Sequence, residues 1–163
     1  MKKASIIVLV LLLGVFLIFA LASGESSTDN QGNGSAAGVE DKDTNLGDYQ
    51  VEIKSCRLAK DYEGKAVVIV KYGFTNNAEE ATAFYLAFED NVYQNGIGLN
   101  EAYILADSAN YSSDNQTKEI KKGASLDVEV AYELNDQTTS VEIEVKELFS
   151  FNDSVVKKTF SIT

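Results

Sequence analysis

The sequence contains no histidine, no proline and no tryptophan, and only one cysteine and one methionine. Without histidine, the chain cannot form a Ser-His-Asp or Cys-His catalytic arrangement or a histidine metal site. The single thiol, Cys56, rules out a disulfide within the chain and any cysteine-cluster zinc site. We expect Cys56 to be a buried, unreactive strand residue. These absences exclude the commonest nucleophilic and metal-dependent mechanisms.

Basic residues are scarce relative to acidic ones. The chain has 14 lysines and arginines against 25 aspartates and glutamates, a net charge of −11. Such a negative field repels nucleic acid and anionic membrane surfaces, so we expect no nucleic-acid partner. The sequence also lacks a phosphate-binding loop and a dinucleotide fingerprint, and no cofactor is expected.

Residues 1–24 have the organisation of a targeting segment. Lys2 and Lys3 are followed by residues 6–22, which carry no charge. A cationic start before an apolar run predicts a signal peptide, although this run also just reaches the length of a spanning helix. In either case the two lysines stay in the cytoplasm. The remainder is therefore expected to be extracellular, either secreted or tethered to the outer face of the cell membrane.

A cleavage site follows the apolar run. Ala20 and Ala22 supply small side chains at the −3 and −1 positions before Ser23. Cleavage there is the favoured interpretation, and a retained N-terminal membrane anchor through residues 6–22 is the alternative. Contact with a membrane is expected only through these residues, and only if they are not removed.

Residues 25–47 are expected to form a disordered linker. The segment is acidic and rich in Ser, Gly and Asn, with Val39 and Leu46 as its only apolar side chains larger than alanine. Such a composition cannot bury enough surface to offset the entropy of ordering. As a random coil it would span roughly 25 Å. It could hold a domain away from a membrane or wall, or have no role.

Residues 48–163 read as an all-β domain. Residues 65–77 form the expected central strand, with Val68, Val70, Tyr72 and Phe74 on its core face. The preceding strand alternates from residue 49 onward and then changes phase, which predicts a β-bulge near Ser55. Further alternation predicts strands at residues 126–134, 141–146 and 155–162.

The middle of this domain is less regular. Residues 82–94 are expected to form a strand with Phe84, Leu86 and Phe88 on one face. Asn95-Gly96 is a strong hairpin signal, with residues 97–105 as the returning strand. Residues 106–118 form a long polar loop.

Seven or eight short strands separated by turn signals predict an antiparallel two-sheet sandwich of immunoglobulin type. A closed barrel is the alternative. The lack of a Cys-Trp-Cys pattern excludes an antibody-type domain.

Four stretches carry a family resemblance: LGDYQVEIKSCRLAKDYEGKAVVIVKYGFTNN, AFYLAFEDNVYQNGI, KEIKKGASLDVEVAYEL and VEIEVKELFSF. They resemble a domain of unknown function found in exported proteins and lipoproteins of Gram-positive bacteria. The resemblance covers roughly residues 46–162 and implies an immunoglobulin-like sandwich outside the cell. It implies no catalytic residue. Gly24 stands where the lipoprotein members carry the lipidated cysteine, so lipid attachment is not expected.

Four tyrosines are candidate ligand contacts: Tyr85, Tyr93, Tyr103 and Tyr111. Exposed tyrosine offers flat contact area and a hydroxyl group, which suit peptides or glycans. Packing within a sheet is the alternative, because aromatic residues are common in strands.

The abundant carboxylates give no specific signal. Glu89-Asp90 and the acids at 127, 129, 133, 142 and 144 are expected on solvated strand faces. Residues 107–115 offer oxygen ligands but lack calcium-loop spacing, and turn chemistry explains them equally well. We therefore assign no catalytic, cofactor-binding or metal-binding residue.

The sequence favours an exported or cell-surface, non-catalytic binding module for an unknown extracellular protein or cell-wall glycan. Two alternatives remain: an extracellular glycan-active hydrolase that uses carboxylates, and a structural accessory domain without a small ligand.

Overall fold

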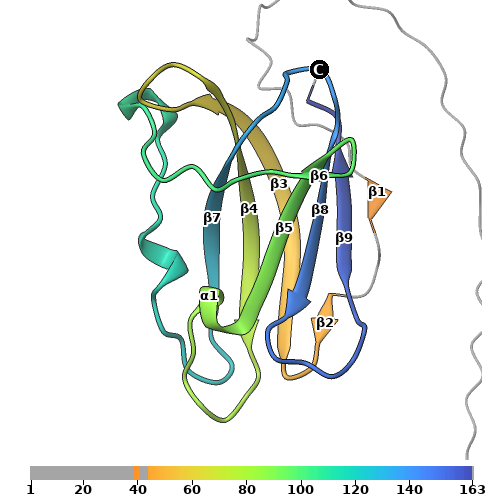
Figure 1. Cartoon of the computed structure of the whole chain (residues 1–163). Coiled ribbons are helices and arrows are strands. Elements are labelled where there is room, and N and C mark those ends of the chain that lie inside the picture. Colours follow the sequence, from red (N-terminus) through yellow and green to blue (C-terminus); the bar gives the residue numbers. More distant parts are fainter. Residues whose placement is uncertain (1–38, 41–43, 163) are drawn as a thin grey trace, which may run out of the picture. The chain divides into compact units, whose positions relative to one another are not determined.

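The structure is a computed structural model that describes residues 39–40 and 44–162 (Figure 1). The predicted targeting segment, with Ala20, Ala22 and Ser23, lies outside the described residues, as does most of the predicted linker. Within the part that is described, no helix has the length and apolar character needed to cross a membrane.

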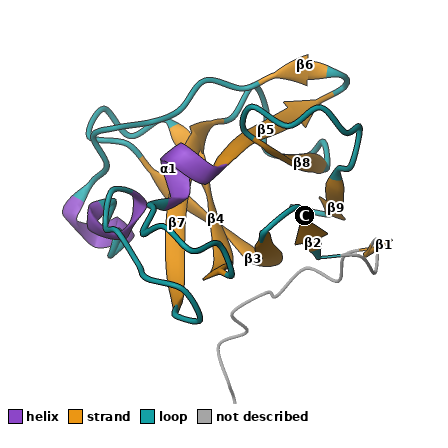
Figure 2. Cartoon of the chain, turned by 90° about the horizontal axis from the view of Figure 1, so that it is seen from below, coloured by secondary structure: helices purple, strands orange, loops and turns teal. Residues whose placement is uncertain are grey.

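The described residues form two antiparallel sheets that face each other, as expected for an immunoglobulin-like sandwich rather than a closed barrel (Figures 1 and 2). One sheet has the order β2 (Asn45–Leu46), β3 (Tyr49–Lys60), β4 (Ala66–Asn76) and β7 (Ser125–Glu133). The other has the order β1 (Val39–Glu40), β9 (Val156–Phe160), β8 (Val141–Glu147), β5 (Phe88–Gln94) and β6 (Ile97–Gly98). The short helices are α1 (Phe84–Ala87), η1 (Asp107–Ala109) and η2 (Asp114–Gln116).

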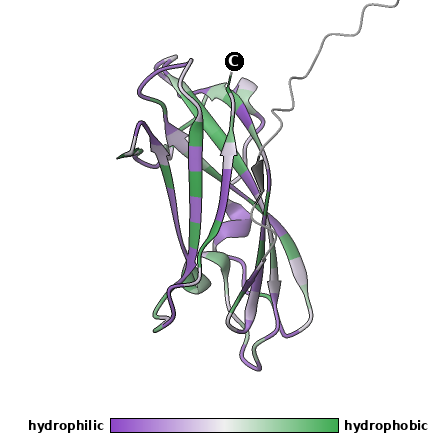
Figure 3. Cartoon of the chain, turned by 90° about the vertical axis from the view of Figure 1, so that its right-hand side faces the viewer, coloured by the Kyte–Doolittle hydropathy of each residue, from purple (hydrophilic) through white to green (hydrophobic). Residues whose placement is uncertain are grey.

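Alternation along the strands determines which side chains enter the core (Figure 3). In β3, Val51 and Ile53 are buried between polar neighbours, and the pairing with β4 shifts between Ile53 and Ser55. This is the predicted bulge. It moves Cys56 to the inner face, where burial raises the pKa of its thiol to about 11. The thiol is therefore not activated at neutral pH.

Aromatic rings from both sheets and from α1 fill the lower end of the sandwich. Phe74 of β4 packs edge-on against Phe88 of β5, with ring centroids 5.4 Å apart. Phe84 of α1 lies 5.1 Å from Tyr72 and 5.3 Å from Phe88. Offset and edge-to-face contacts of this kind add to the stabilisation from burial alone. The predicted core face of residues 65–77 is confirmed, since Val68, Val70, Tyr72 and Phe74 are fully buried.

The strand predicted over residues 82–94 is wrong in its first half. Phe84–Ala87 form one helical turn, and the strand begins only at Phe88. Phe84 and Phe88 are both buried, whereas Leu86 is exposed. Residues four apart share a face of a helical turn, so Phe84 reaches the core from α1.

The returning strand predicted over residues 97–105 is also too long. The Asn95-Gly96 hairpin is present, with both residues at positive φ, but β6 ends at Gly98. The chain then leaves this sheet and crosses to the other one. Ala102 donates a backbone hydrogen bond to Ala131 of β7, and Leu105 forms a bridge with Asp61.

The folded part begins before Asp48. Asn45–Leu46, placed in the linker by their composition, pair with β3 as β2, and Leu46 is 1% exposed. Val39–Glu40 pair with β9 on the other sheet as β1. Both short strands therefore contribute to the edges of the sandwich, one on each sheet.

Candidate functional site

A second apolar cluster lies on the outer face of β4 and β7, outside the sandwich. Val67 and Ile69 point away from the main core, yet both are buried. Residues 99–118 cover them, and contribute Ala102 and Ala109 to the cluster together with Ala131 of β7. The long polar loop predicted here is irregular, as expected, but it is packed onto the sheet.

Side chains fix this loop to the sheet. The guanidinium of Arg57 donates to the carbonyl oxygens of Ala109 (2.6 Å) and Asn110 (3.0 Å) and pairs with Glu129 (3.1 Å). On the edge of β7, Gln116 Nε2 donates to the carbonyl of Glu129 at 2.7 Å. Charged and bidentate contacts hold geometry better than single neutral hydrogen bonds. The loop is therefore held in one position relative to the sheet.

The preceding residue of the loop makes the same kind of contact. Asn115 Nδ2 donates to the carbonyl of Asp127 at 2.9 Å. Two successive amide side chains thus bind two successive outward-facing carbonyls of β7.

The loop borders an open cavity of about 600 Å³. Tyr103 and Tyr111 both line it, with hydroxyl, amide and carboxylate groups: Asp107, Asn110, Ser112, Ser113 and Asp114. Tyr103 is 81% exposed, and the nearby charge of Glu101 raises the pKa of its hydroxyl. Tyr111 is half-buried, and its hydroxyl accepts a hydrogen bond from Gln116 (3.0 Å). One free aromatic face and several polar groups therefore meet in one cavity.

The four candidate tyrosines do not form a single site. Only Tyr103 and Tyr111 share the cavity. Tyr85 is exposed on α1, which lies near the lower end of the sandwich in Figure 1, whereas η1 lies at the upper end. Tyr93 lies on β5, where it pairs with Gly98. Two of the four candidate tyrosines therefore lie at one cavity, and the sequence alone could not group them.

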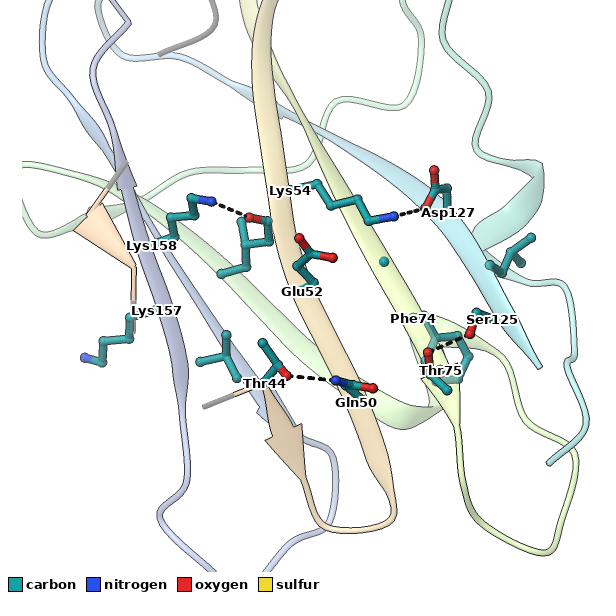
Figure 4. Close-up of a pocket in the computed structure, with 14 residues that line it drawn as sticks. Thr44, Gln50, Glu52, Lys54, Phe74, Thr75, Ser125, Asp127, Lys157 and Lys158 are labelled. Carbon is teal, nitrogen blue, oxygen red and sulfur yellow. Dashed lines mark hydrogen bonds and ion pairs between the residues drawn. The ribbon is translucent and has the colours of Figure 1, made fainter. Parts of the chain in front are cut away.

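A larger hollow of about 700 Å³ lies along β3 (Figure 4). Its floor includes Gly73, whose missing side chain leaves room for Lys54: a Cβ there would lie 2.6 Å from the Lys54 side chain. Glu52 and Lys54 of β3 and Asp127 of β7 line the hollow from the two strands on either side of β4, as Figure 4 shows. Lys158 reaches it from β9 and donates to the carbonyl oxygen of Ile53 at the bulge (2.9 Å).

Two charges in this hollow, those of Lys54 and Asp127, are already paired. Asp127 accepts from Lys54 (2.5 Å) and pairs with Lys71 (2.9 Å), and these contacts hold its pKa below the usual value. A carboxylate in that state is a poor general acid. No aromatic side chain offers an exposed face here. The smaller cavity with Tyr103 is therefore the better candidate site.

A partly buried acid lies between the sheets. Asp90, expected on a solvated face, shares the inner face of β5 with Phe88 and Val92 and accepts a hydrogen bond from the Tyr132 hydroxyl. Desolvation raises the pKa of Asp90 to about 6. The Tyr72 hydroxyl is fully buried beside it and makes no hydrogen bond of ordinary geometry. This acid has a perturbed pKa, but it lines neither cavity.

The described residues include no group of three or more acidic or cysteine side chains arranged to hold a metal ion. In the predicted oxygen-rich segment 107–115, the carbonyls of Ala109 and Asn110 accept from Arg57, and Asn115 binds β7. These groups position the loop.

The architecture is that of an immunoglobulin-like β-sandwich with a packed loop on one outer face. Residues 24–147 match the family model described as "Domain of unknown function (DUF5067)", and the chain belongs to this family. No protein with a curated description matches the chain.

Two solved structures have a similar fold. One is described as "a putative lipoprotein from Staphylococcus aureus subsp. aureus NCTC 8325"; it is 21% identical, has a TM-score of 0.53, and the match covers 74% of this chain and 92% of that one. The other is a conserved hypothetical protein from Bacillus anthracis, 15% identical with a TM-score of 0.52, covering 81% of this chain and 100% of that one. At this identity the likeness concerns the fold.

Proposed function

We propose that the chain is a non-catalytic binding module displayed outside a Gram-positive cell, with its ligand site in the cavity of Tyr103 and Tyr111. The cationic start and apolar run of residues 1–24 support export. The similarity to a Staphylococcus aureus protein described as a lipoprotein agrees with this location. Residues 6–22 anchor the chain if they are retained, and cleavage before Ser23 releases it.

The cavity itself carries the proposal. An exposed tyrosine face beside hydroxyl and carboxylate groups suits a sugar, whose ring has apolar C–H faces and hydroxyl edges. The loop is already fixed by Arg57 and Gln116, so little ordering is needed on binding. We therefore propose cell-wall glycan as the ligand, and an extracellular protein is the alternative partner.

Binding rather than hydrolysis is favoured because Asp90, the acid whose pKa is clearly raised among the described residues, does not line the cavity. A glycosidase needs a carboxyl group with a raised pKa next to the substrate. Asp90 has such a pKa, but it faces the core beside Tyr132. The acid paired in the larger hollow, Asp127, has a lowered pKa.

Titration of the full chain with purified cell-wall glycan strands tests the proposal. Tyr103→Ala is expected to weaken binding at least about tenfold, as for an aromatic contact residue. Tyr85→Ala, at a comparably exposed tyrosine on α1, is the matched control and is expected to leave affinity unchanged. Equal effects of the two substitutions would argue against the cavity. Release of new reducing ends from the glycan would favour the hydrolase instead.

A further inference from the structure

The connection between β8 and β9 carries two phenylalanines whose side chains are exposed to solvent. Phe149 is 89% exposed and Phe151 is 108% exposed. They carry the largest exposed fractions among the exposed large apolar residues of the described chain. Large apolar side chains that gather on an exposed surface mark interaction sites.

Hydrogen bonds fix the backbone of the connection on either side of these residues. Leu148 donates a backbone hydrogen bond to Ala87 (2.8 Å), and Asn152 and Ser154 are held by the short side chains of Ser150 and Asn152. Phe149 has a φ of 63°, in the left-handed region that bulky residues avoid. Strain of this kind at an exposed aromatic residue marks a segment kept for a function other than stability.

The position of the β8–β9 connection, here called the tip, indicates what covers Phe149 and Phe151. It follows Glu147, which pairs with Phe88 next to α1, at the lower end of the sandwich in Figure 1. The cavity of Tyr103 follows the bridge between Asp61 and Leu105 at the upper end. The two ends are separated by the length of β3, whose 12 residues span about 40 Å.

We propose that Phe149 and Phe151 insert into the outer surface of the lipid bilayer and present the opposite end of the sandwich to the cell wall. In the chain that keeps residues 6–22, residues 23–38 can span at most about 58 Å even when fully extended. The domain then stays close to the bilayer, and tethering makes a weak contact effective. This inference uses the proposed location but not the proposed ligand.

The negative charge of the protein determines which lipid headgroups the tip can approach. Glu147 and Asp153 flank the two phenylalanines, and the chain as a whole is strongly acidic. Attraction to anionic headgroups is therefore excluded, and the contact depends on apolar insertion. Binding is expected to be stronger on zwitterionic than on anionic bilayers.

The absence of tryptophan allows a local test in the full chain, reconstituted in phosphatidylcholine vesicles. Phe149→Trp and, separately, Phe151→Trp each introduce a single reporter. The tryptophan fluorescence of both variants is expected to shift to shorter wavelength than in water. It is also expected to be quenched when the lipid acyl chains are brominated. Ile97→Trp, an exposed apolar position on β6, is the control and is expected to stay water-like.

Three results would overturn the proposal. One is an unshifted, unquenched spectrum from both tip reporters. The second is equal quenching at Ile97→Trp, which would indicate unspecific adsorption. The third is a tip shift that depends on protein concentration without vesicles, which would make a second copy the occupant. Glycan binding is measured separately, so its failure leaves this test unaffected.

Discussion

At the scale of single residues, Asp90 makes stability depend on pH. Its pKa rises from 3.8 to about 6 on folding because burial disfavours its charged form. The folded state therefore binds an extra proton between these values. The stability from this group is fully present below about pH 4 and is lost as the pH rises through 6. The difference is at most about 3 kcal/mol.

Asp90→Asn is expected to raise the free energy of unfolding at pH 7 to 8 and to flatten its decline between pH 4 and 7. The amide still accepts the hydrogen bond from Tyr132. Denaturant melts across this pH range measure the effect. Glu89→Gln, on the exposed face of the same strand, serves as the control. A wild-type stability that does not fall between pH 4 and 7 would show that Asp90 is ionised without penalty.

The same residue shows where sequence reasoning stops. Alternation places Phe88, Asp90 and Val92 on one face of the strand. A charged residue in this apolar series suggests, from sequence alone, that the face has been assigned wrongly. Only the two tyrosines that meet it from β4 and β7 explain its burial, and they are distant in sequence. Glu129 was likewise expected to be solvated, whereas it pairs with Arg57.

At the scale of elements, local patterns predicted the long strands well and the short elements poorly. Strands β3, β4, β7, β8 and β9 each occupy a region that alternation or β-branched composition indicated. One turn of helix at Phe84–Ala87 has the same apolar positions as a strand, since Phe84 and Phe88 are both even-numbered. Tertiary packing against Tyr72 and Phe74, not local propensity, decides between the two.

The packing of residues 99–118 onto β4 could not be predicted from the sequence for another reason. Val67 and Ile69 read as the outward face of β4, and nothing local indicates that residues 99–118 return to cover them. The available signal was that this face is apolar: a solvated strand would carry polar residues there.

Arg57→Ala is expected to free the loop from the sheet. Three acceptors lose a charged donor, which corresponds to about 1–3 kcal/mol. Hydrogen exchange should accelerate across residues 106–118, while the strands of the other sheet stay protected. Lys65→Ala, which breaks an exposed pair with Glu63, is the control and should change stability by less than about 1 kcal/mol. Unchanged exchange in the loop would show that apolar packing alone holds it.

At the scale of the whole molecule, the start of the domain can be tested by truncation. Residues 39–163 retain both short N-terminal strands, whereas residues 48–163 lose the buried Leu46. Burial of a leucine side chain is worth about 1.5–3 kcal/mol. The shorter chain is expected to melt at a lower temperature with the same β content by circular dichroism. Equal melting temperatures would show that β2 adds nothing to the fold.

Processing of the N-terminus is a second prediction at this scale. Intact-mass spectrometry of the protein from its native host is expected to find Ser23 as the first residue in a large part of the population. Replacing Ala20 and Ala22 by bulky residues should block cleavage and leave the chain anchored and facing outward. A soluble cytoplasmic protein that begins at Met1 would contradict the proposed location.

The contacts that dock the loop on β7 have a consequence for self-association of the protein. Asn115 and Gln116 occupy carbonyls that a strand from another molecule would otherwise bind, and Ala102 occupies the next one, on Ala131. The edge is thereby closed to intermolecular sheet growth, which is how open edges seed aggregation. A second copy of the chain therefore finds the carbonyls of Asp127, Glu129 and Ala131 already occupied.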